Sequence, residues 1–186
     1  MRQLIAFNNI TLDGYFTDMH GDMSWAHTTD PEFRAFVENN TRAGGMLLFG
    51  RVTYELMAAY WPTPLALQND PVVAGRINQM PKIVFSRTLH DPSWSNTSAL
   101  HQDPVAAVRR MKQEPGQGMT ILGSGSIVSQ LTSARLIDEY QVVVNPVILG
   151  RGRTMFHGIE SKLALTLTKT RAFANGNVLL CYQPKV

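Results

Sequence analysis

The chain has 186 residues, of which 44% are hydrophobic and 17% charged, the profile of one ordinary globular domain. Its formal net charge of +3 comes without a cluster of five or more Lys and Arg residues, which argues against a nucleic-acid-binding face. The single cysteine, Cys181, excludes an intramolecular disulfide and a CxxC zinc site, and no apolar run approaches the ~20 residues that span a bilayer. We therefore expect one cytoplasmic domain over residues 1–186 that acts on a small molecule and has neither a nucleic-acid nor a membrane partner.

Strands and helices alternate along the first two thirds of the chain. Residues 4–12 predict a first strand, and a polar loop over residues 13–29 follows it. Asp30-Pro31-Glu32 is typical of a helix start, because it combines an N-cap oxygen, a proline at the first helical position and an acid in the first turn. Short apolar runs at residues 46–49, 83–85 and 119–122 predict strands buried on both faces. Helical patterns begin at Asp103-Pro104 and cover residues 126–135, so the crossovers indicate parallel strands.

The last third of the chain has a different pattern. Residues 141–149 predict a long strand interrupted by Pro146, and residues 163–167 alternate apolar and polar side chains as a half-buried strand does. Residues 178–182 predict another strand, and Asn175-Gly176, before it, is the preferred dipeptide of a tight hairpin turn. The sequence therefore predicts an α/β fold whose mainly parallel sheet ends in an antiparallel hairpin.

Two turns that follow buried strands have the chemistry of a phosphate site. Gly50-Arg51-Val52-Thr53 opens a helix, whose N-terminal N–H groups carry a partial positive charge, and Arg51 and Thr53 add donors. Gly123-Ser124-Gly125-Ser126-Ile127 is a second turn of this kind, but Val128 takes the last position of a GxGxxG motif. The next strand does not end in the acid that a Rossmann site expects, so the usual NAD-binding fold is disfavoured. The alternative for each turn is ordinary packing without a ligand.

A third strand end carries Ser86-Arg87-Thr88, a cation with two hydroxyls. Such a set is suited to a phosphate, although a solvated surface arginine explains it as well. Ligands of open α/β sheets bind beyond the carboxyl ends of the strands. The combination of three such turns therefore indicates a nucleotide site at that edge of the sheet.

The order and spacing of these motifs resemble the dihydrofolate reductase superfamily over nearly the whole chain. The resemblance is carried by Leu12-Asp13-Gly14, Trp25, Gly50-Arg51-Val52-Thr53-Tyr54, Ser86-Arg87-Thr88 and Gly123-Ser124-Gly125. Residues 136–140 and 145–153 are more similar to the bacterial branch that includes the reductase domain of bifunctional riboflavin-biosynthesis proteins than to true folate reductases. The resemblance implies a dihydrofolate-reductase-like α/β fold with a mixed, mostly parallel central sheet of about eight strands, flanking helices and a C-terminal antiparallel hairpin.

The resemblance also implies a site for NADPH. Gly50, Arg51 and Thr53 would hold its phosphates, and Ser86 and Arg87 would lie by the adenosine 2′-phosphate. The cradle under the pyrophosphate and the nicotinamide ribose would consist of Gly123, Ser124, Gly125, Ser126 and Ile127. Asn8 and Asn9 would border the nicotinamide, and the loop from Asp13 to Trp25 would act as a lid.

The substrate side has alternatives for every candidate residue. Asp30 lies five residues after Trp25, where folate reductases carry the acid that pairs with a pterin ring, but capping a helix explains Asp30 as well. Trp25, at the end of the expected lid, would contact the substrate or serve the lid alone. Trp61 would form the floor of a planar substrate or belong to the core. Arg151 would bind a ribose phosphate or be a solvated turn residue.

Together these features imply an NADPH-dependent reductase that transfers a hydride to a small heterocyclic substrate. Within the riboflavin branch this substrate would be 5-amino-6-(5-phosphoribosylamino)uracil. Two alternatives stay open: a dihydrofolate reductase, and a protein of another class that binds NADP(H) without catalysis. The histidines lack metal-ligand spacing, so we expect no metal. Because the related family commonly forms dimers, a homodimer is the expected oligomer.

Overall fold

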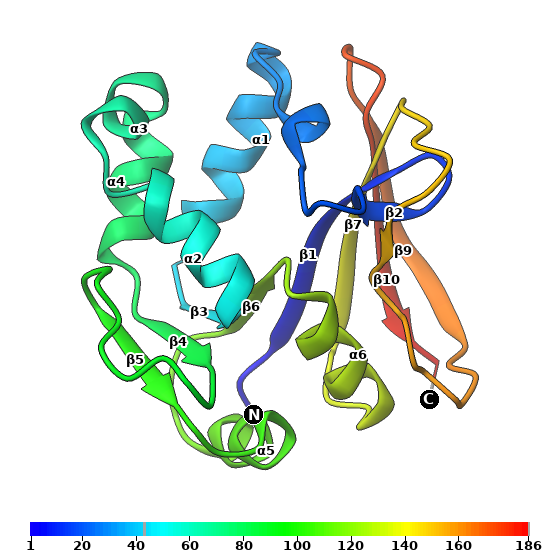
Figure 1. Ribbon diagram of the computed structural model, residues 1–186. Coiled ribbons are helices and arrows are strands. Elements are labelled where there is room, and N and C mark those ends of the chain that lie inside the picture. Colours follow the sequence, from blue (N-terminus) through cyan, green and yellow to red (C-terminus); the bar gives the residue numbers. More distant parts are fainter. Residues whose placement is uncertain (43, 186) are drawn as a thin grey trace.

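The computed structural model describes residues 1–42 and 44–185, and its centre is one eight-stranded sheet (Figure 1). Its strands are β1 (Leu4–Thr11), β3 (Met46–Gly50), β4 (Lys82–Phe85), β5 (Thr97–Leu100), β6 (Met119–Leu122), β7 (Glu139–Asn145), β9 (Leu165–Ala172) and β10 (Val178–Pro184). The strand order is β5-β4-β3-β6-β1-β7-β10-β9. The strands from β5 to β7 run parallel, and β10 is antiparallel to both of its neighbours. The predicted α/β fold, with a mostly parallel sheet and a C-terminal antiparallel hairpin, is confirmed.

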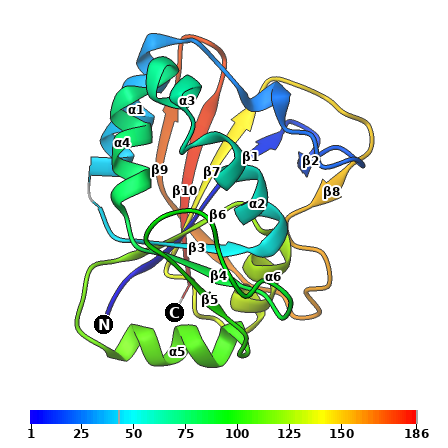
Figure 2. The same cartoon turned by 60° about the vertical axis from the view of Figure 1, so that its left-hand side comes forward.

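Helices cover both faces of this sheet (Figure 2). They are α1 (Pro31–Arg42), α2 (Arg51–Tyr60), α3 (Pro64–Asn69), α4 (Pro71–Gln79), α5 (Pro104–Gln113) and α6 (Gly125–Ser133). Successive side chains of β3 point to opposite faces: Phe49 packs with Tyr54 of α2, whereas Leu48 packs with Val128 of α6. Among the described helices, none is long and apolar enough to cross a membrane.

Side-chain caps start three of the helices. Asp30, Thr63 and Asp103 each accept a hydrogen bond from the backbone N–H three residues later, over 2.7, 3.2 and 2.8 Å. Each cap is followed by a proline at the first helical position, which has no N–H to leave unpaired. The starts at Asp30 and Asp103 are as predicted, whereas α3 and α4 were not predicted.

Several boundaries differ from the prediction. The long strand expected over residues 141–149 is wrong in its second half: β7 starts at Glu139 and ends at Asn145, because Pro146 has no N–H to continue the ladder. The first strand ends at Thr11, one residue early, and α6 begins at Gly125, one residue early. The half-buried strand expected from residue 163 begins at Leu165. None of these differences moves a strand to another place in the sheet.

The polar loop over residues 13–29, whose part from Asp13 to Trp25 is the predicted lid, contains two short elements. These are β2 (Tyr15–Thr17) and the 3-10 helix η1 (Ser24–Ala26). β2 pairs with β8 (Arg153–Thr154) in a separate two-stranded sheet. The lid is therefore attached to the segment that follows β7.

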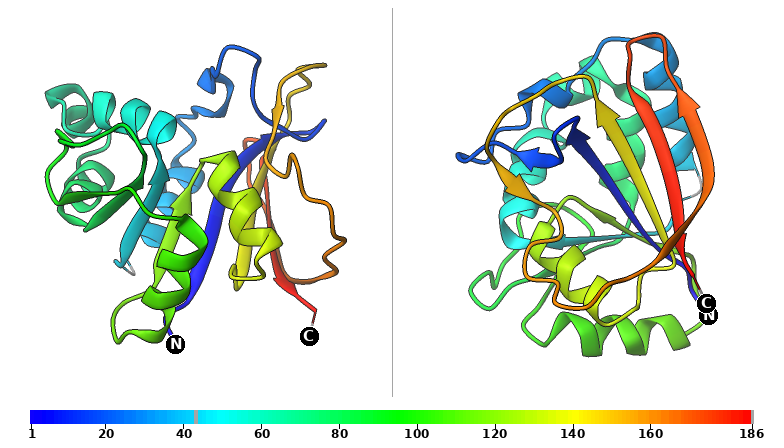
Figure 3. Two further views of the ribbon diagram at one scale, coloured as in Figure 1. Left: turned by 60° about the horizontal axis from the view of Figure 1, so that its bottom comes forward. Right: turned by 90° about the vertical axis from the view of Figure 1, so that its right-hand side faces the viewer.

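The hairpin between β9 and β10 confirms the Asn175-Gly176 turn. The N–H of Gly176 donates to the carbonyl of Phe173 over 3.0 Å, and Gly176 has a φ of +85°, which favours glycine. Phe173 packs edge-on against Phe33 of α1 at a ring distance of 5.1 Å. Cys181 lies in the same cluster, and its burial raises the pKa of its thiol. Figure 3 (right) faces this end of the sheet.

Candidate functional site

The three candidate turns lie at one edge of the sheet. They follow β3, β4 and β6, and β3 runs parallel to both β4 and β6. The carboxyl ends of these strands therefore point the same way, and the turns after them meet where open α/β sheets bind their ligands. The sequence prediction that these turns share one edge is consistent with this topology.

A reciprocal pair of hydrogen bonds joins the first turn to the glycine-containing turn. The N–H of Gly50 donates to Ser124 Oγ over 2.7 Å, and the N–H of Ser124 donates to Thr53 Oγ1 over 3.0 Å. Each hydroxyl accepts one bond here and keeps its own hydrogen for donation. We call this arrangement the clasp; it holds the starts of α2 and α6 together.

Gly123 makes this close approach feasible. Its φ is +62°, and a Cβ built on it would lie 3.0 Å from Thr53 Cγ2. The following residue, Ser124, also has a positive φ of +60°, an uncommon conformation for a residue other than glycine. The turn is thus held in a strained shape that the clasp stabilises.

Both helices at the clasp start without a side-chain cap from the described residues. Neither Gly50, the N-cap of α2, nor Ser124, the N-cap of α6, makes a side-chain cap hydrogen bond. Uncapped N–H groups with the positive end of a helix dipole form a site for an anion. Two such ends side by side, with two hydroxyl donors between them, fit the phosphates of a dinucleotide.

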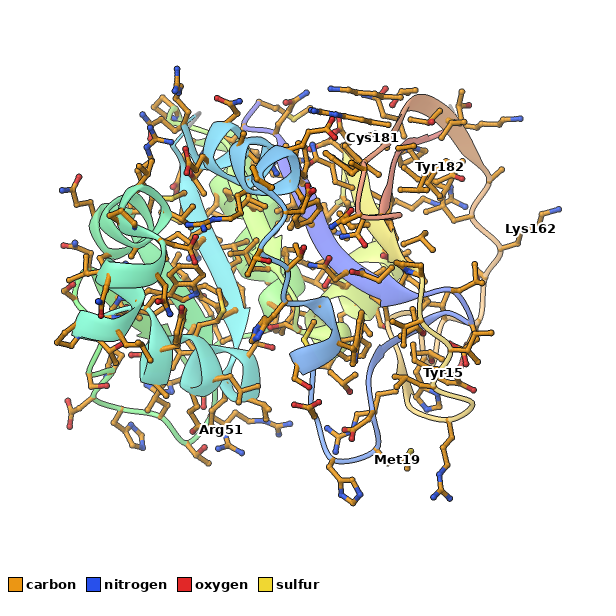
Figure 4. The ribbon with its side chains drawn as sticks, turned by 90° about the horizontal axis from the view of Figure 1, so that it is seen from above. Tyr15, Met19, Arg51, Lys162, Cys181 and Tyr182 are labelled. Atoms are coloured by element: carbon orange, nitrogen blue, oxygen red, sulfur yellow. The ribbon has the colours of Figure 1, made fainter. Side chains whose placement is uncertain are left out.

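Arg51 adds a positive charge at one of these helix ends. It lies at the first position of α2 and pairs with Glu55 over 2.8 Å, with both side chains about half exposed. Seen from above, Arg51 and Met19 of the lid lie on the same side of the molecule (Figure 4). An exposed ion pair of this kind contributes little to stability, so the guanidinium is accessible to a phosphate.

Ser86 and Arg87 occupy the turn after β4. The Ser86 hydroxyl accepts hydrogen bonds from the N–H groups of Thr88 and Leu89 over 3.2 and 3.0 Å. Arg87 is exposed, and within residues 1–42 and 44–185 it forms no ion pair. The turn thus has a fixed backbone and an unneutralised cation.

Asn8 and Asn9 lie near the end of β1 and point to opposite faces of the sheet. Asn9 Oδ1 accepts a hydrogen bond from Asn145 Nδ2 over 3.2 Å. Asn8 is 4% exposed, and its buried Nδ2 lacks a partner among the described residues. Because buried donors are normally paired, this amide is available to a bound group.

The lid contacts the start of α6. A Cβ on Gly125 would lie 2.9 Å from the Phe16 ring, which belongs to β2. Of the other residues expected in the cradle, Ser126 is exposed and Ile127 is buried in the core. Gly123 to Ser126 would therefore be the part of the predicted cradle that a cofactor can reach, because Ile127 lies in the core.

Asp30 caps α1, as one of its two interpretations predicted. Its Oδ1 accepts from the N–H of Phe33, and its own N–H donates to Thr28 Oγ1 over 3.1 Å. Its second oxygen, Oδ2, has no hydrogen bond to a described residue. The cap therefore uses only Oδ1 of the carboxylate, and the substrate role of Asp30 stays a prediction.

The other substrate candidates lie apart from one another. Trp25 is in η1, and its buried Nε1 lacks a partner within the described part of the chain. Trp61 packs against the cluster around Phe49, and its Nε1 donates to Met57 Sδ over 3.3 Å. These contacts are those expected if Trp61 belongs to the core. Arg151 is exposed in the turn after β7. Their substrate roles stay predictions.

Asp13 is a residue whose role the sequence did not indicate. Its carboxylate accepts from the N–H of Gly150 over 2.7 Å and from that of Leu149 over 3.1 Å. The hydrogen bond from the Thr11 hydroxyl, followed by these N–H groups, holds the pKa of Asp13 below its usual 3.8. Asp13 thus ties the base of the lid to the turn that carries Arg151. The partners are over 130 residues apart in the sequence, so no local pattern could have indicated this contact.

The chain is similar to known proteins over nearly its whole length. The chain is 25% identical over 183 residues to the uncharacterised protein YyaP of Bacillus subtilis (strain 168), with 97% of this chain and 94% of YyaP covered. Its fold is similar to that of a protein from Shewanella sp. PV-4 provisionally described as a riboflavin biosynthesis protein, with a TM-score of 0.75, 21% identity and 99% of both chains covered.

A second solved structure is longer than this chain. It is the diaminohydroxyphosphoribosylaminopyrimidine deaminase/5-amino-6-(5-phosphoribosylamino)uracil reductase of Thermotoga maritima, with a TM-score of 0.71 and 17% identity. The match covers 99% of this chain and 57% of that one. The model of the RibD C-terminal domain matches residues 2–179. The protein therefore belongs to the RibD C-terminal domain family, the riboflavin branch that its motifs resemble.

Proposed function

We propose that the chain is an NADPH-dependent reductase that transfers a hydride to a small heterocyclic substrate, most closely 5-amino-6-(5-phosphoribosylamino)uracil. Membership of the RibD C-terminal domain family supports an oxidoreductase of the riboflavin-pathway type. The observation that carries the proposal is the clasp, which places two uncapped helix N-termini side by side.

The chain's own contribution is binding and positioning. The first N–H groups of α2 and α6, with the hydroxyls of Thr53 and Ser124, would bind the pyrophosphate, and Ser86 and Arg87 would bind the adenosine 2′-phosphate. Bound NADPH supplies the hydride. The Asn8 amide would orient the nicotinamide, and the lid would exclude water from the acceptor carbon.

Binding and turnover test the proposal separately. The purified chain is titrated with NADPH by fluorescence, and NADPH oxidation is then followed with the phosphoribosylaminouracil and with dihydrofolate. We expect saturable binding of NADPH and oxidation with the pyrimidine. Failure of NADPH to bind or to raise the melting temperature would overturn the proposal. Binding of NADPH without its oxidation by either the pyrimidine or dihydrofolate would support the alternative of a non-catalytic NADP(H)-binding protein.

Dihydrofolate reduction is the second candidate activity, and one observation favours it. Asp30 keeps one carboxylate oxygen free of hydrogen bonds to described residues while the other caps α1. A free carboxylate oxygen is what an aminopyrimidine ring would bind and what proton delivery would require. Oxidation of NADPH with dihydrofolate at a rate above that with the pyrimidine would establish this candidate. Slow or absent turnover of dihydrofolate would exclude it.

A further inference from the structure

Three asparagines lie on neighbouring strands near the carboxyl ends of β1 and β7. Asn9 belongs to β1, Asn145 is the last residue of β7, and Asn177 directly precedes β10. Each stands two residues from an apolar residue of the cluster beneath α1. These apolar residues are Phe7, Val143 and Leu179, respectively. Because side chains alternate along a strand, the three amides point to the α1 face of the sheet, and we call them the amide row.

The hydrogen bonds of Asn145 fix the direction of two of the amides. Its Nδ2 donates to the carbonyl oxygens of Ile10 and Val143 and to Asn9 Oδ1, each over 3.2 Å. Carbonyl oxygens only accept, so the amide nitrogen of Asn145 must face them. Asn145 Oδ1 and Asn9 Nδ2 are then left over, and neither has a hydrogen bond to a described residue. The amide row thus offers an acceptor on β7 and a donor on β1.

Asn177 adds a second donor, which is buried. Its side chain is 3% exposed, and its Nδ2 has no hydrogen-bond partner among the described residues. Buried donors are normally paired, and an unpaired one lowers the stability of the fold. A bound group that brings an acceptor to Asn177 Nδ2 would remove this cost. The buried amide therefore points to a ligand with a hydrogen-bond acceptor.

A chain of hydrogen bonds connects the amide row to the start of α1. The N–H of Asn177 donates to Asn175 Oδ1 over 3.0 Å, and Asn175 Nδ2 donates to Thr28 Oγ1 over 3.2 Å. Thr28 Oγ1 also accepts from the N–H of Asp30. The hairpin tip and the start of α1 lie at the same end of the molecule (Figure 1). The amide row and Asp30, the substrate candidate, therefore lie at one end of the same face of the sheet.

We propose that the amide row recognises the pyrimidinedione edge of the substrate, where one N–H stands between two carbonyl oxygens. Asn9 Nδ2 and Asn177 Nδ2 each donate to a carbonyl oxygen, and Asn145 Oδ1 accepts from the N–H. This inference deepens the proposed function and rests on it, because it assigns residues to the ring of a uracil-type substrate. It also assigns Asn9 to the substrate instead of the nicotinamide.

The same amide row disfavours the aminopyrimidine ring of dihydrofolate. In that ring an amino group takes the place of one carbonyl, so a donor of the ligand meets a donor of the protein. A site built for hydrogen bonding rejects a ligand that leaves its buried polar groups unpaired. One unpaired donor corresponds to a loss of at least about fivefold in affinity. The amide row and the free oxygen of Asp30 therefore favour different rings.

The test uses two rings that differ in one group. These are 5,6-diaminouracil and 2,5,6-triaminopyrimidin-4-one, which has an amino group in place of one carbonyl. Their dissociation constants are measured by calorimetry, with and without NADP⁺, for the wild type and for Asn177→Leu. Leucine is close to asparagine in shape, so it removes the donor without opening a large cavity. The matched control is Asn39→Leu, which changes an exposed asparagine near the last turn of α1.

The preference between the two rings is the expected signature. We expect the wild type and Asn39→Leu to bind 5,6-diaminouracil at least about fivefold more tightly than the triaminopyrimidinone, and Asn177→Leu to lose this preference. Because the leucine replaces a donor that is unpaired in the free protein, the melting temperature of Asn177→Leu should equal or exceed that of the wild type. An amide with a purely structural role would lower the melting temperature when it is removed.

The outcomes distinguish this inference from the proposed function. Binding of neither ring, equal affinity of the wild type for both, or an unchanged preference in Asn177→Leu would overturn the inference. If Asn177→Leu weakens NADPH and not 5,6-diaminouracil, the amide row serves the nicotinamide; the inference is then wrong and the proposed function stands. If 5,6-diaminouracil binds as expected and NADPH does not bind, the proposed function fails and the assignment of the amide row to the ring stands.

Discussion

Gly123 combines a positive φ with a contact that leaves no room for a side chain. A Cβ at this position would lie 3.0 Å from Thr53 Cγ2. For Gly123→Ala we expect a loss of about 1–3 kcal/mol of folding stability from backbone strain. We also expect at least about tenfold weaker binding of NADPH, a change of about 1.4 kcal/mol, because the clasp must open. Thermal unfolding and fluorescence titration measure the two effects.

The control for this substitution is Gly158→Ala. Gly158 has a φ of +79°, and a Cβ on it would meet no atom within 4 Å. This variant should therefore show the backbone strain without the loss of NADPH affinity. Equal affinity in Gly123→Ala and the wild type would contradict the role of the clasp in cofactor binding.

Substitutions of Asp30 can separate its role as the cap of α1 from a role in turnover of the substrate. Asparagine caps helices about as well as aspartate, whereas alanine loses about 1 kcal/mol. We therefore expect Asp30→Asn to keep the melting temperature and Asp30→Ala to lower it. If the free oxygen serves the substrate, turnover falls at least about tenfold in both variants, as for a lost proton-transfer group. Unchanged turnover in Asp30→Asn would show that Asp30 caps α1 and has no role in turnover.

The capping signals explain how much of the helical structure could be predicted. Asp30-Pro31 and Asp103-Pro104 were recognised as helix starts because apolar residues at helical spacing follow them. Thr63-Pro64 and Asp70-Pro71 carry the same signal, and α3 and α4 begin there, but α3 has six residues, too few for a periodic pattern. A search for a capping residue before a proline would have found both.

The short strands and the long-range contacts of the site could not be predicted. β8 has only two residues, and β5 reads Thr-Ser-Ala-Leu, which is neither a continuous apolar run nor an alternating pattern. The candidate phosphate residues can be predicted because glycines, hydroxyls and arginines directly after buried strands are local signals. The clasp depends on Thr53 meeting Ser124, 71 residues later, and no local pattern specifies such a contact.

The clasp also predicts that the stability of the start of α6 depends on Thr53 of α2. Thr53→Val keeps the shape of the side chain but removes the oxygen that accepts from the N–H of Ser124. Because an unpaired donor costs about 1–3 kcal/mol, we expect faster amide hydrogen exchange at the start of α6 than in the wild type. Thr168→Val, which removes a hydroxyl bonded to the carbonyl of Cys181 at the other end of the sheet, should leave exchange in α6 unchanged. Unaltered protection of α6 in Thr53→Val would show that the two turns are independent.

The stability of the whole molecule should depend on pH through Lys82. This side chain is 1% exposed, and its Nζ donates to the carbonyls of Asn78, Met80 and Ser95 over 3.1, 2.7 and 3.1 Å. Burial lowers the pKa of Lys82 from 10.5 to about 8. Between these two values the unfolded chain binds the proton that the folded chain releases, so the free energy of unfolding rises with pH.

Urea unfolding of the wild type and of Lys82→Met at about pH 7.5 and about pH 9.5 measures this contribution. We expect the wild type to gain stability relative to the variant at the higher pH. Lys162→Met, in the exposed loop before β9, is the control and should follow the wild type at both values. A difference between the wild type and Lys82→Met that does not change with pH would contradict the lowered pKa of Lys82.

Because its single cysteine is buried, the molecule is suited to selective labelling at an introduced cysteine. Cys181 is 4% exposed and its thiol has a raised pKa, so it reacts slowly with reagents that require a thiolate. Met19, at 53% exposure, lies in the lid, on the side away from Cys181 (Figure 4). In a Met19→Cys variant the new thiol is the preferred point of attachment for a fluorescent dye. The predicted closure of the lid over a bound cofactor can thus be tested by titrating the labelled protein with NADPH, with its own cysteine left in place.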